Sequence, residues 1–125
     1  MIKGIGVDII EIGRIRSSIE QDGGRFLSKV FTDGEIAYCS ARPNADQHYA
    51  ARFAAKEAVS KALSTGWSGI FRWKDVEVTN APSGQPLVTL HGDLRELLAG
   101  SRLMLSLSHS DSHVVAVAVI EGTGP

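Results

Sequence analysis

The chain has 125 residues, one cysteine and a formal net charge of −1, with 43% hydrophobic and 22% charged residues. This length predicts one domain over residues 1–125, and the well-mixed composition excludes the disordered and fibrous classes. The small net charge argues against a broad nucleic-acid-binding surface. We expect a cytoplasmic protein without a membrane span, because Cys39 has no partner cysteine, the apolar runs are short and a secretory signal pattern is lacking.

The first predicted element is a strand over residues 2 to 10. Two-residue alternation gathers its apolar side chains, Ile5, Val7 and Ile9, on one face. The opposite face carries Asp8 and two glycines, so another backbone or a ligand could approach it closely. An aspartate within an Ile/Val-rich strand is unfavourable unless a positive group or a metal lies nearby.

Three short helical segments are predicted next. From residue 11 isoleucines recur at helical spacing until Gly23 and Gly24 end the pattern, and a second segment covers residues 25 to 30. Thr32 and Glu35 then have the spacing of a capping box, in which the threonine side chain and the glutamate satisfy each other's backbone N–H groups. The third helix should therefore begin at this point.

The longest helix is predicted over residues 45 to 63, which are alanine-rich and contain neither glycine nor proline. Pro43 separates it from the preceding helix, and Asn44 can cap its N-terminus. Gly66 after Thr65 is expected to close it. This helix should form the centre of the fold.

After this helix the hydrophobic period changes from helical to alternating. The strand-like runs are residues 76 to 78, 87 to 90, 104 to 108 and 114 to 121. The turn-forming sequence at residues 81 to 84 (APSG) joins the first two as a hairpin, and a short helix is predicted over residues 93 to 99. The predicted fold class is α+β, with one mainly antiparallel sheet packed on the long helix.

One candidate site involves the long helix, where Glu57 and Lys61 share a face and Arg52 and Lys56 occupy a neighbouring stripe. A simple interpretation is a solvated Glu57–Lys61 pair that contributes about 0.2–0.5 kcal/mol. The alternative is that Asp8 and Glu57 share a hard cation such as Mg²⁺, which binds few protein oxygens and keeps positions for phosphate ligands. Spacing alone leaves both interpretations open.

A second candidate site is the segment at residues 106 to 110 (SLSHS). A Ser–His nucleophilic pair is disfavoured, because a Gly-x-Ser-x-Gly turn is missing and neighbours in a strand do not face each other. A zinc site with His109 and His113 needs two more ligands, and neither Cys39 nor His48 has a suitable spacing. His109 is therefore an ordinary polar residue at a strand end or a phosphate-binding histidine.

Three segments follow one another along the chain at residues 4–11 (GIGVDIIE), 52–62 (RFAAKEAVSKA) and 106–110 (SLSHS). In order and separation they closely resemble the holo-[acyl-carrier-protein] synthases, the small 4′-phosphopantetheinyl transferase family. The resemblance includes the helix exit at Thr65-Gly66 and the sequence Gly84-Gln85-Pro86, and it covers nearly the whole chain.

The resemblance implies an enzyme that transfers 4′-phosphopantetheine from coenzyme A to a serine of apo acyl carrier protein in fatty acid biosynthesis, releasing adenosine 3′,5′-bisphosphate. It implies a homotrimer with active sites at the subunit interfaces. Asp8 and Glu57 would bind Mg²⁺, and Lys61, the third catalytic residue, would contact the phosphates. The residues implied in coenzyme A binding are Lys61, Gly84 and Pro86, together with Arg52 and His109 near the 3′-phosphate.

The implied reaction needs a proton acceptor. When the serine hydroxyl attacks the β-phosphorus, negative charge accumulates on the pyrophosphate, and the metal and Lys61 would stabilise it. Glu57, Asp8 or a metal-bound water could accept the serine proton. We prefer the water, because a carboxylate engaged by Mg²⁺ is a poor base.

The resemblance also implies that Arg14, Arg25 and Phe26 dock the acidic helix of the carrier protein. Relatives often carry further basic residues before Arg25, whereas this chain has residues 21 to 24 (QDGG) there, so docking is expected to be weaker or specific to one partner. Lys29 would partly compensate.

Two further departures from the family pattern are Gln85, where a lysine is common, and His113, where an aromatic residue is common, and both could change the affinity for coenzyme A. A non-catalytic carrier-protein or nucleotide-binding module would be favoured if Asp8, Glu57 or Lys61 were replaced, and all three are present. A different Mg²⁺-dependent phosphotransferase stays possible from the residues, because a metal and phosphate site does not name its donor.

Overall fold

The computed structural model describes residues 1–22, 24–64 and 71–122. In chain order its elements are β1 (Ile2–Glu11), α1 (Ile12–Gln21), α2 (Arg25–Val30), α3 (Asp33–Ser40), α4 (Ala45–Leu63), the 3₁₀ turn η1 (Trp73–Asp75), β2 (Val76–Asn80), β3 (Pro86–Leu90), α5 (Gly92–Leu97), β4 (Ser101–His109) and β5 (His113–Gly122). The long helix has its predicted bounds, whereas Gly23, Thr65 and Gly66, predicted to end helices, lie outside the described residues.

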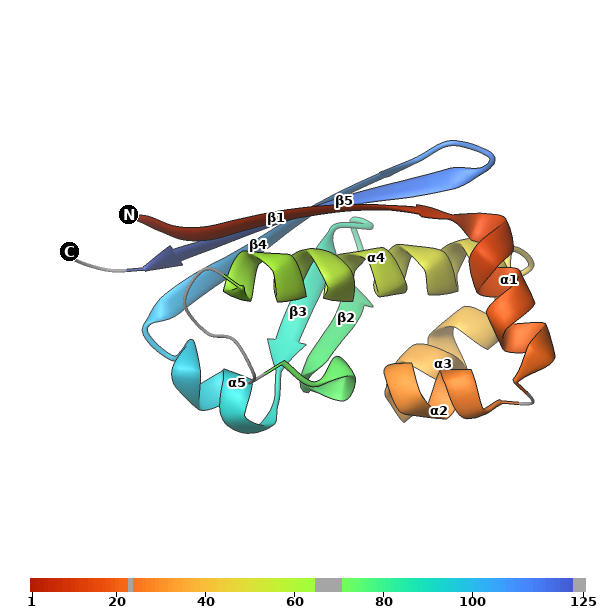
Figure 1. Ribbon diagram of the computed structural model, residues 1–125, viewed down its shortest axis with the longest axis horizontal. Helices are drawn as coiled ribbons and strands as arrows, with labels where there is room; N and C mark the ends of the chain where they lie inside the picture. The colour runs from red at the N-terminus through yellow and green to blue at the C-terminus, as the bar shows by residue number, and fades with distance from the viewer. Residues whose placement is uncertain (23, 65–70, 123–125) are drawn as a thin grey trace.

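The strands form two antiparallel sheets around α4 (Figure 1). One has the strand order β1-β5-β4, and the other is the predicted hairpin β2-β3. The α+β class is confirmed, but the strands make two sheets where the sequence predicted one. Helix α5 forms the connection between β3 and β4, and a groove of about 450 Å³ lies between these two strands in place of a hydrogen-bonded ladder.

Glycines in β1 allow α4 to pack directly against this strand. A Cβ atom on Gly6 would lie 2.6 Å from the backbone nitrogen of Ala62 and closer still to the carbonyl oxygen of Ala58. A Cβ atom on Gly4 would collide with the carbonyl oxygen of Ala62. The sequence left open whether a backbone or a ligand approaches this face, and the structure places the backbone of α4 there.

The core lies between α4 and the inner face of the three-stranded sheet (Figure 1). Small residues pack there from both sides, among them Ala54 and Ala58 of α4 and Ala116 and Ala118 of β5, all fully buried. Small side chains bring helix and sheet close together, so the position of α4 relative to β1 is closely determined.

The other face of β1 points away from the core. Ile5, Val7 and Ile9 are 64%, 56% and 62% exposed, and we call these three residues the outer apolar stripe. A contiguous exposed apolar surface of this kind marks an interaction site.

The helix starts follow the sequence signals in part. Thr32 and Glu35 form the predicted capping box at the start of α3. Asn44 occupies the N-cap position of α4, but its side chain makes no capping bond and donates instead to the Gln47 side chain. In the part of the chain that the structure describes, no helix has the length and hydropathy needed to cross a membrane.

Candidate active site

Lys61, in the last turn of α4, reaches across to the middle of β1. Its Nζ donates to Asp8 Oδ1 at 3.0 Å and to the Val7 carbonyl oxygen at 3.2 Å. The Asp8 side chain is only 13% exposed, so this ion pair is partly shielded from solvent. Lys61 is therefore paired with a residue of another element, and no Glu57–Lys61 ion pair is found among the described residues.

Glu57 lies one helical turn before Lys61 and is half-buried. Burial raises the pKa of the Glu57 carboxyl, the negative charge of Asp8 raises it further, and Lys61 lowers it. The two carboxylates are thus close enough to repel each other. We call Asp8, Glu57 and Lys61 the Asp8 group.

The chemistry of the Asp8 group fits a magnesium ion. Among the described residues no cluster of three or more His, Cys, Asp or Glu side chains could hold a metal, so the protein ligands would be two carboxylates. Mg²⁺ is commonly bound by one or two carboxylates, with waters and substrate phosphates completing the octahedron. A cation at Asp8 and Glu57 would also remove the repulsion that raises the pKa of Glu57.

Arg52 lies on a different side of α4 and lines a hollow of about 230 Å³, which we call the Arg52 hollow. The Arg52 side chain is 3% exposed, and its Nη2 donates to Asn80 Oδ1 at 2.9 Å. Its buried Nε has no hydrogen-bond partner within the described residues, and none of the described lining residues is acidic. A buried guanidinium without a carboxylate favours an anionic ligand.

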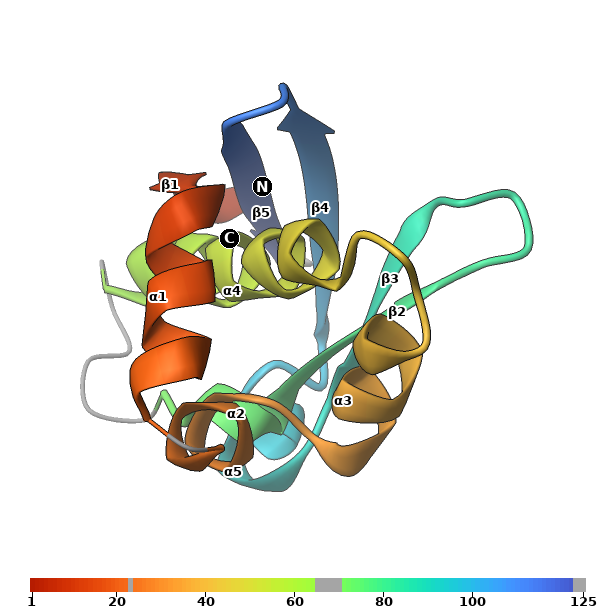
Figure 2. The same cartoon turned by 90° about the vertical axis from the view of Figure 1, so that its right-hand side faces the viewer.

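The structure brings Gly84 and His109 to the Arg52 hollow. Gly84 has a φ of +92°, which glycine adopts without strain in the hairpin turn, and this turn projects from the body of the molecule in Figure 2. Pro86, by contrast, lines the groove between β3 and β4. Two of these three predicted ligand-binding residues therefore meet Arg52, and Pro86 belongs to a neighbouring surface.

His109 ends β4 and contacts the beginning of α4. Its Nε2 lies 3.0 Å from Gln47 Nε2, and its Nδ1 lies 3.4 Å from the carbonyl oxygen of Ser110. Neither contact involves a serine hydroxyl, so the geometry lends no support to a Ser–His nucleophilic pair at His109.

The Asp8 group and the Arg52 hollow lie apart within one copy of the chain. Arg52 precedes Glu57 by five positions, which places the two side chains about 140° apart around α4. Asp8 is on β1 and His109 is on β4, the two outer strands of the sheet, separated by β5 and thus by about 10 Å. A single copy therefore does not gather the predicted site residues in one cleft.

The residues predicted to dock a carrier protein lie on the first two helices. Arg14 on α1 and Arg25 on α2 are exposed. Phe26 is half-buried, and its ring packs against Phe31 and Phe53 with centroid distances of 6.0 and 5.9 Å. Phe26 thus belongs in part to the core.

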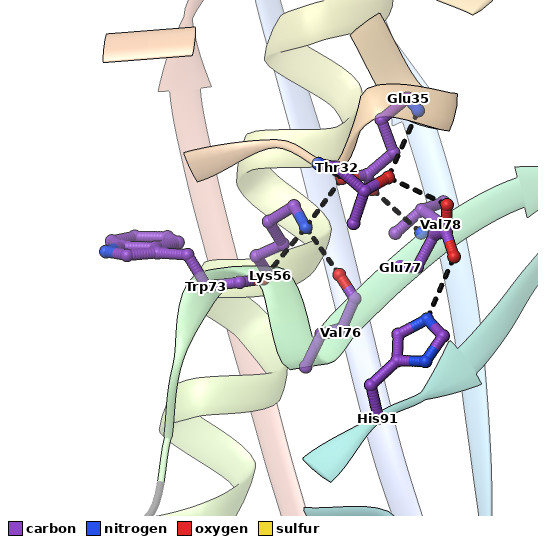
Figure 3. Close-up of polar contacts among 8 residues, drawn as sticks. All are labelled: Thr32, Glu35, Lys56, Trp73, Val76, Glu77, Val78 and His91. Carbon is purple, nitrogen blue, oxygen red and sulfur yellow. Dashed lines mark hydrogen bonds and ion pairs between the residues drawn. The ribbon is translucent and has the colours of Figure 1, made fainter. Parts of the chain in front are cut away.

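A buried ion pair that the sequence did not predict joins α3 and α4 (Figure 3). Lys56 Nζ lies 2.9 Å from Glu35 Oε1, and both side chains are 0% exposed. Lys56 also donates to the carbonyl oxygens of Trp73 and Val76, and Glu35 Oε2 accepts from the Val78 backbone N–H. Helical spacing places Lys56 on a stripe, but no pattern in the sequence names a partner on another helix.

One protein-family model, described as the 4′-phosphopantetheinyl transferase superfamily, matches residues 4–118. The chain belongs to this superfamily. The holo-[acyl-carrier-protein] synthase of Desulforudis audaxviator is 50% identical over 98% of this chain and 95% of its own. The resemblance predicted from the three segments is therefore confirmed, and the chain is a transferase.

Solved structures of the same family agree with the fold of this transferase. The holo-[acyl-carrier-protein] synthase of Neisseria meningitidis has a TM-score of 0.87 at 31% identity and covers 97% of this chain and 99% of its own. The enzyme of Bacillus anthracis, in complex with coenzyme A (3′,5′-ADP), has a TM-score of 0.82 at 34% identity, with coverages of 98% and 99%.

Proposed function

We propose that this transferase moves 4′-phosphopantetheine from coenzyme A to a serine hydroxyl of an apo acyl carrier protein, giving holo-acyl carrier protein and adenosine 3′,5′-bisphosphate in fatty acid biosynthesis. The observation that carries the proposal is the contact between Lys61 and Asp8 beside Glu57, because it joins two segments shared with the family. The names of the relatives and the coenzyme A complex of the Bacillus anthracis enzyme support the donor and the acceptor. Residues 1–125 would act as one domain in the cytoplasm.

In this reaction the serine Oγ forms a bond to the β-phosphorus while the bond from that phosphorus to the bridging oxygen breaks. The leaving adenosine 3′,5′-bisphosphate takes the electron pair, and the serine proton passes to a water oriented by the Asp8 and Glu57 carboxylates. Lys61 Nζ, which lies at Asp8, would donate to a phosphate oxygen as negative charge accumulates there. Mg²⁺ held by Asp8 and Glu57 would supply additional positive charge at the pyrophosphate.

The Arg52 hollow would take the nucleotide end of coenzyme A. Arg52 brings a positive charge that no described acidic side chain neutralises, and His109 lies at the same hollow. Both residues would face the 3′-phosphate, while Gly84 and Pro86 would contact the nucleoside. A phosphate there would satisfy the buried guanidinium.

A complete active site would then need two copies of the chain. The outer apolar stripe exposes three large side chains on β1, the strand that carries Asp8. A homotrimer that buries this stripe would bring the Asp8 group of one copy to the Arg52 hollow of the next, which agrees with their separation within one copy. Arg14 and Arg25, exposed on neighbouring helices, would receive the acidic helix of the carrier protein, with the edge of the Phe26 ring beside them.

The test is intact-mass spectrometry of an apo acyl carrier protein incubated with the enzyme, coenzyme A and Mg²⁺. We expect a mass gain of one phosphopantetheine, which is lost with EDTA and restored by added Mg²⁺. A carrier protein whose acceptor serine is replaced by alanine is the matched control and should gain nothing. The absence of a mass gain with several carrier proteins would contradict the proposal and favour a non-catalytic module. An equal mass gain in the presence of EDTA would contradict the proposed requirement for Mg²⁺.

A further inference from the structure

Two guanidinium groups lie against the ring of Tyr38 on α3. Arg42 Cζ is 3.3 Å from the ring centroid, and Arg52 Cζ is 4.3 Å from the same centroid. Arg42 follows Tyr38 by four positions, whereas Arg52 comes from α4, so the ring joins two segments of the chain. The two cationic carbons are no farther apart than the sum of these two distances.

Neither cation is neutralised within the described part of the chain. The ion pairs there involve other basic residues, and Arg42 Nη1 donates to the Tyr38 carbonyl oxygen at 2.8 Å. Like charges this close repel each other, and the negative face of an aromatic ring offsets only part of that repulsion. The arrangement therefore favours the binding of an anion.

His48 lies close to the same two arginines, and their positive charges affect its pKa. Its ring meets the Tyr38 ring edge-on at a centroid distance of 5.7 Å. Burial lowers the pKa of His48, and the charges of Arg52, Arg42 and His109 lower it further. The two guanidinium groups thus lie together at the Tyr38 ring and the Arg52 hollow that it lines.

The contacts of Arg52 show what the ring does. One terminal nitrogen is bound to Asn80 Oδ1, and a single hydrogen bond by itself does not fix the rotation of a guanidinium plane. Packing against the ring removes that freedom, since a guanidinium gains most when it lies over an aromatic face.

We propose that Tyr38 is a positioning residue of the donor site, whose ring holds the Arg52 guanidinium, with Arg42 beside it, ready for an anionic group of the ligand. The inference rests on the proposed function, under which that group is the 3′-phosphate of coenzyme A. Tyr38 itself need not touch the ligand. It sets the preference for a donor with this phosphate over a donor without it.

Calorimetric binding to the Tyr38→Leu variant tests the proposal, with adenosine 3′,5′-bisphosphate and adenosine 5′-monophosphate as probes. Leucine keeps apolar bulk but removes the aromatic face, so the variant should bind the bisphosphate about tenfold more weakly and the monophosphate within about twofold of the wild type. Tyr38→Phe keeps the face and should bind both as the wild type does. Equal loss of both nucleotides in Tyr38→Leu, or loss of the bisphosphate alone in Tyr38→Phe, would overturn the proposal.

The matched control is Ile36→Ala, which loosens the packing of α3 against the core and leaves the Tyr38 ring in place. If it reproduces the selective loss of the bisphosphate, the effect of Tyr38 comes from the fold and the proposal fails. In the transfer reaction, Tyr38→Leu should raise KM for coenzyme A by about tenfold, leave kcat within about twofold and leave KM for dephospho-coenzyme A unchanged. The nucleotide-binding measurements test the positioning role of Tyr38. Phosphopantetheine transfer by the wild type tests the proposed function separately.

Discussion

Lys61 Nζ lies 3.0 Å from Asp8 Oδ1, although the two residues are 53 positions apart in the chain. This contact depends on the glycines of β1, because Gly4 and Gly6 let the end of α4 lie directly against the strand. The close packing of α4 on the glycine-bearing face of β1 thus brings the Lys61 ammonium to the Asp8 carboxylate.

Replacing Glu57 by Gln should reduce kcat for phosphopantetheine transfer about 10²–10³-fold, the usual cost of removing one preorganised group that stabilises developing charge. Without metal the fold should be as stable as the wild type or more so. The folded state raises the pKa of Glu57, so its charge is unfavourable near neutral pH, and that unfavourable contribution disappears as the pH falls through the raised pKa. Turnover assays and thermal unfolding with and without Mg²⁺ measure both effects.

In those unfolding experiments Mg²⁺ should raise the melting temperature of the wild type and leave that of Glu57→Gln unchanged. Lys74→Met removes an exposed lysine away from this group and serves as the control, with wild-type turnover and an unaltered response to Mg²⁺. Wild-type turnover by Glu57→Gln would refute the metal assignment.

The second prediction concerns assembly. Replacing Ile5 by Glu puts a charge into the outer apolar stripe without disturbing the core, since the Ile5 side chain is 64% exposed. Sedimentation should show a trimer for the wild type and a folded monomer for Ile5→Glu, and transfer activity should fall with the loss of the trimer. The Ile5→Val variant keeps the stripe apolar and should behave as the wild type. A fully active Ile5→Glu monomer would show that one copy forms a complete site.

The helices and strands were predictable because the signals for them are local. The bounds of α4 follow from an alanine-rich run without helix breakers, and the start of α3 follows from the spacing of Thr32 and Glu35. The division into two sheets was not predictable, because it depends on how α5 turns the chain between β3 and β4.

The residues of the candidate site could be named from the sequence, but the contacts between them could not. The carboxylate on β1 was notable in the sequence, yet only the fold shows that Lys61 reaches Asp8 and that Arg52 faces a different hollow. The role of Tyr38 and the pairing of Glu35 with Lys56 gave no signal in the sequence, since the partners lie on other elements. Long-range contacts of this kind depend on tertiary packing rather than on spacing.

The third prediction follows from the buried Glu35–Lys56 pair. Glu35→Gln leaves the Lys56 ammonium buried without its counter-charge and should lower the free energy of unfolding by about 3–5 kcal/mol. The double variant Glu35→Leu/Lys56→Met removes both charges and should be less destabilised than Glu35→Gln alone, although the Val78 and Thr32 N–H groups lose their acceptor. Urea unfolding of the two variants measures the difference. A double variant less stable than Glu35→Gln would contradict this account.

The last prediction is a dependence of stability on pH at Glu77. Its Oε2 accepts from Thr32 Oγ1 at 2.7 Å, and its Oε1 lies 2.9 Å from His91 Nε2. These contacts, with that of Thr32 the stronger, lower the pKa of Glu77 from its usual 4.5. The unfolded chain therefore binds the proton more readily, so Glu77 stabilises the fold above pH 4.5, and this stabilisation is lost as the pH falls through the lowered pKa.

Urea unfolding at a series of pH values should show Glu77→Gln less stable than the wild type near neutral pH, with the two curves converging in acid. Thr32→Val should also reduce the difference between neutral and acid pH and should cost about 1 kcal/mol through loss of the α3 cap. Glu96→Gln, at an exposed glutamate on α5, is the matched control and should follow the wild-type curve. A constant difference between the wild type and Glu77→Gln down to the lowest pH would mean that the Glu77 side chain contributes through its shape and hydrogen bonds rather than through its charge.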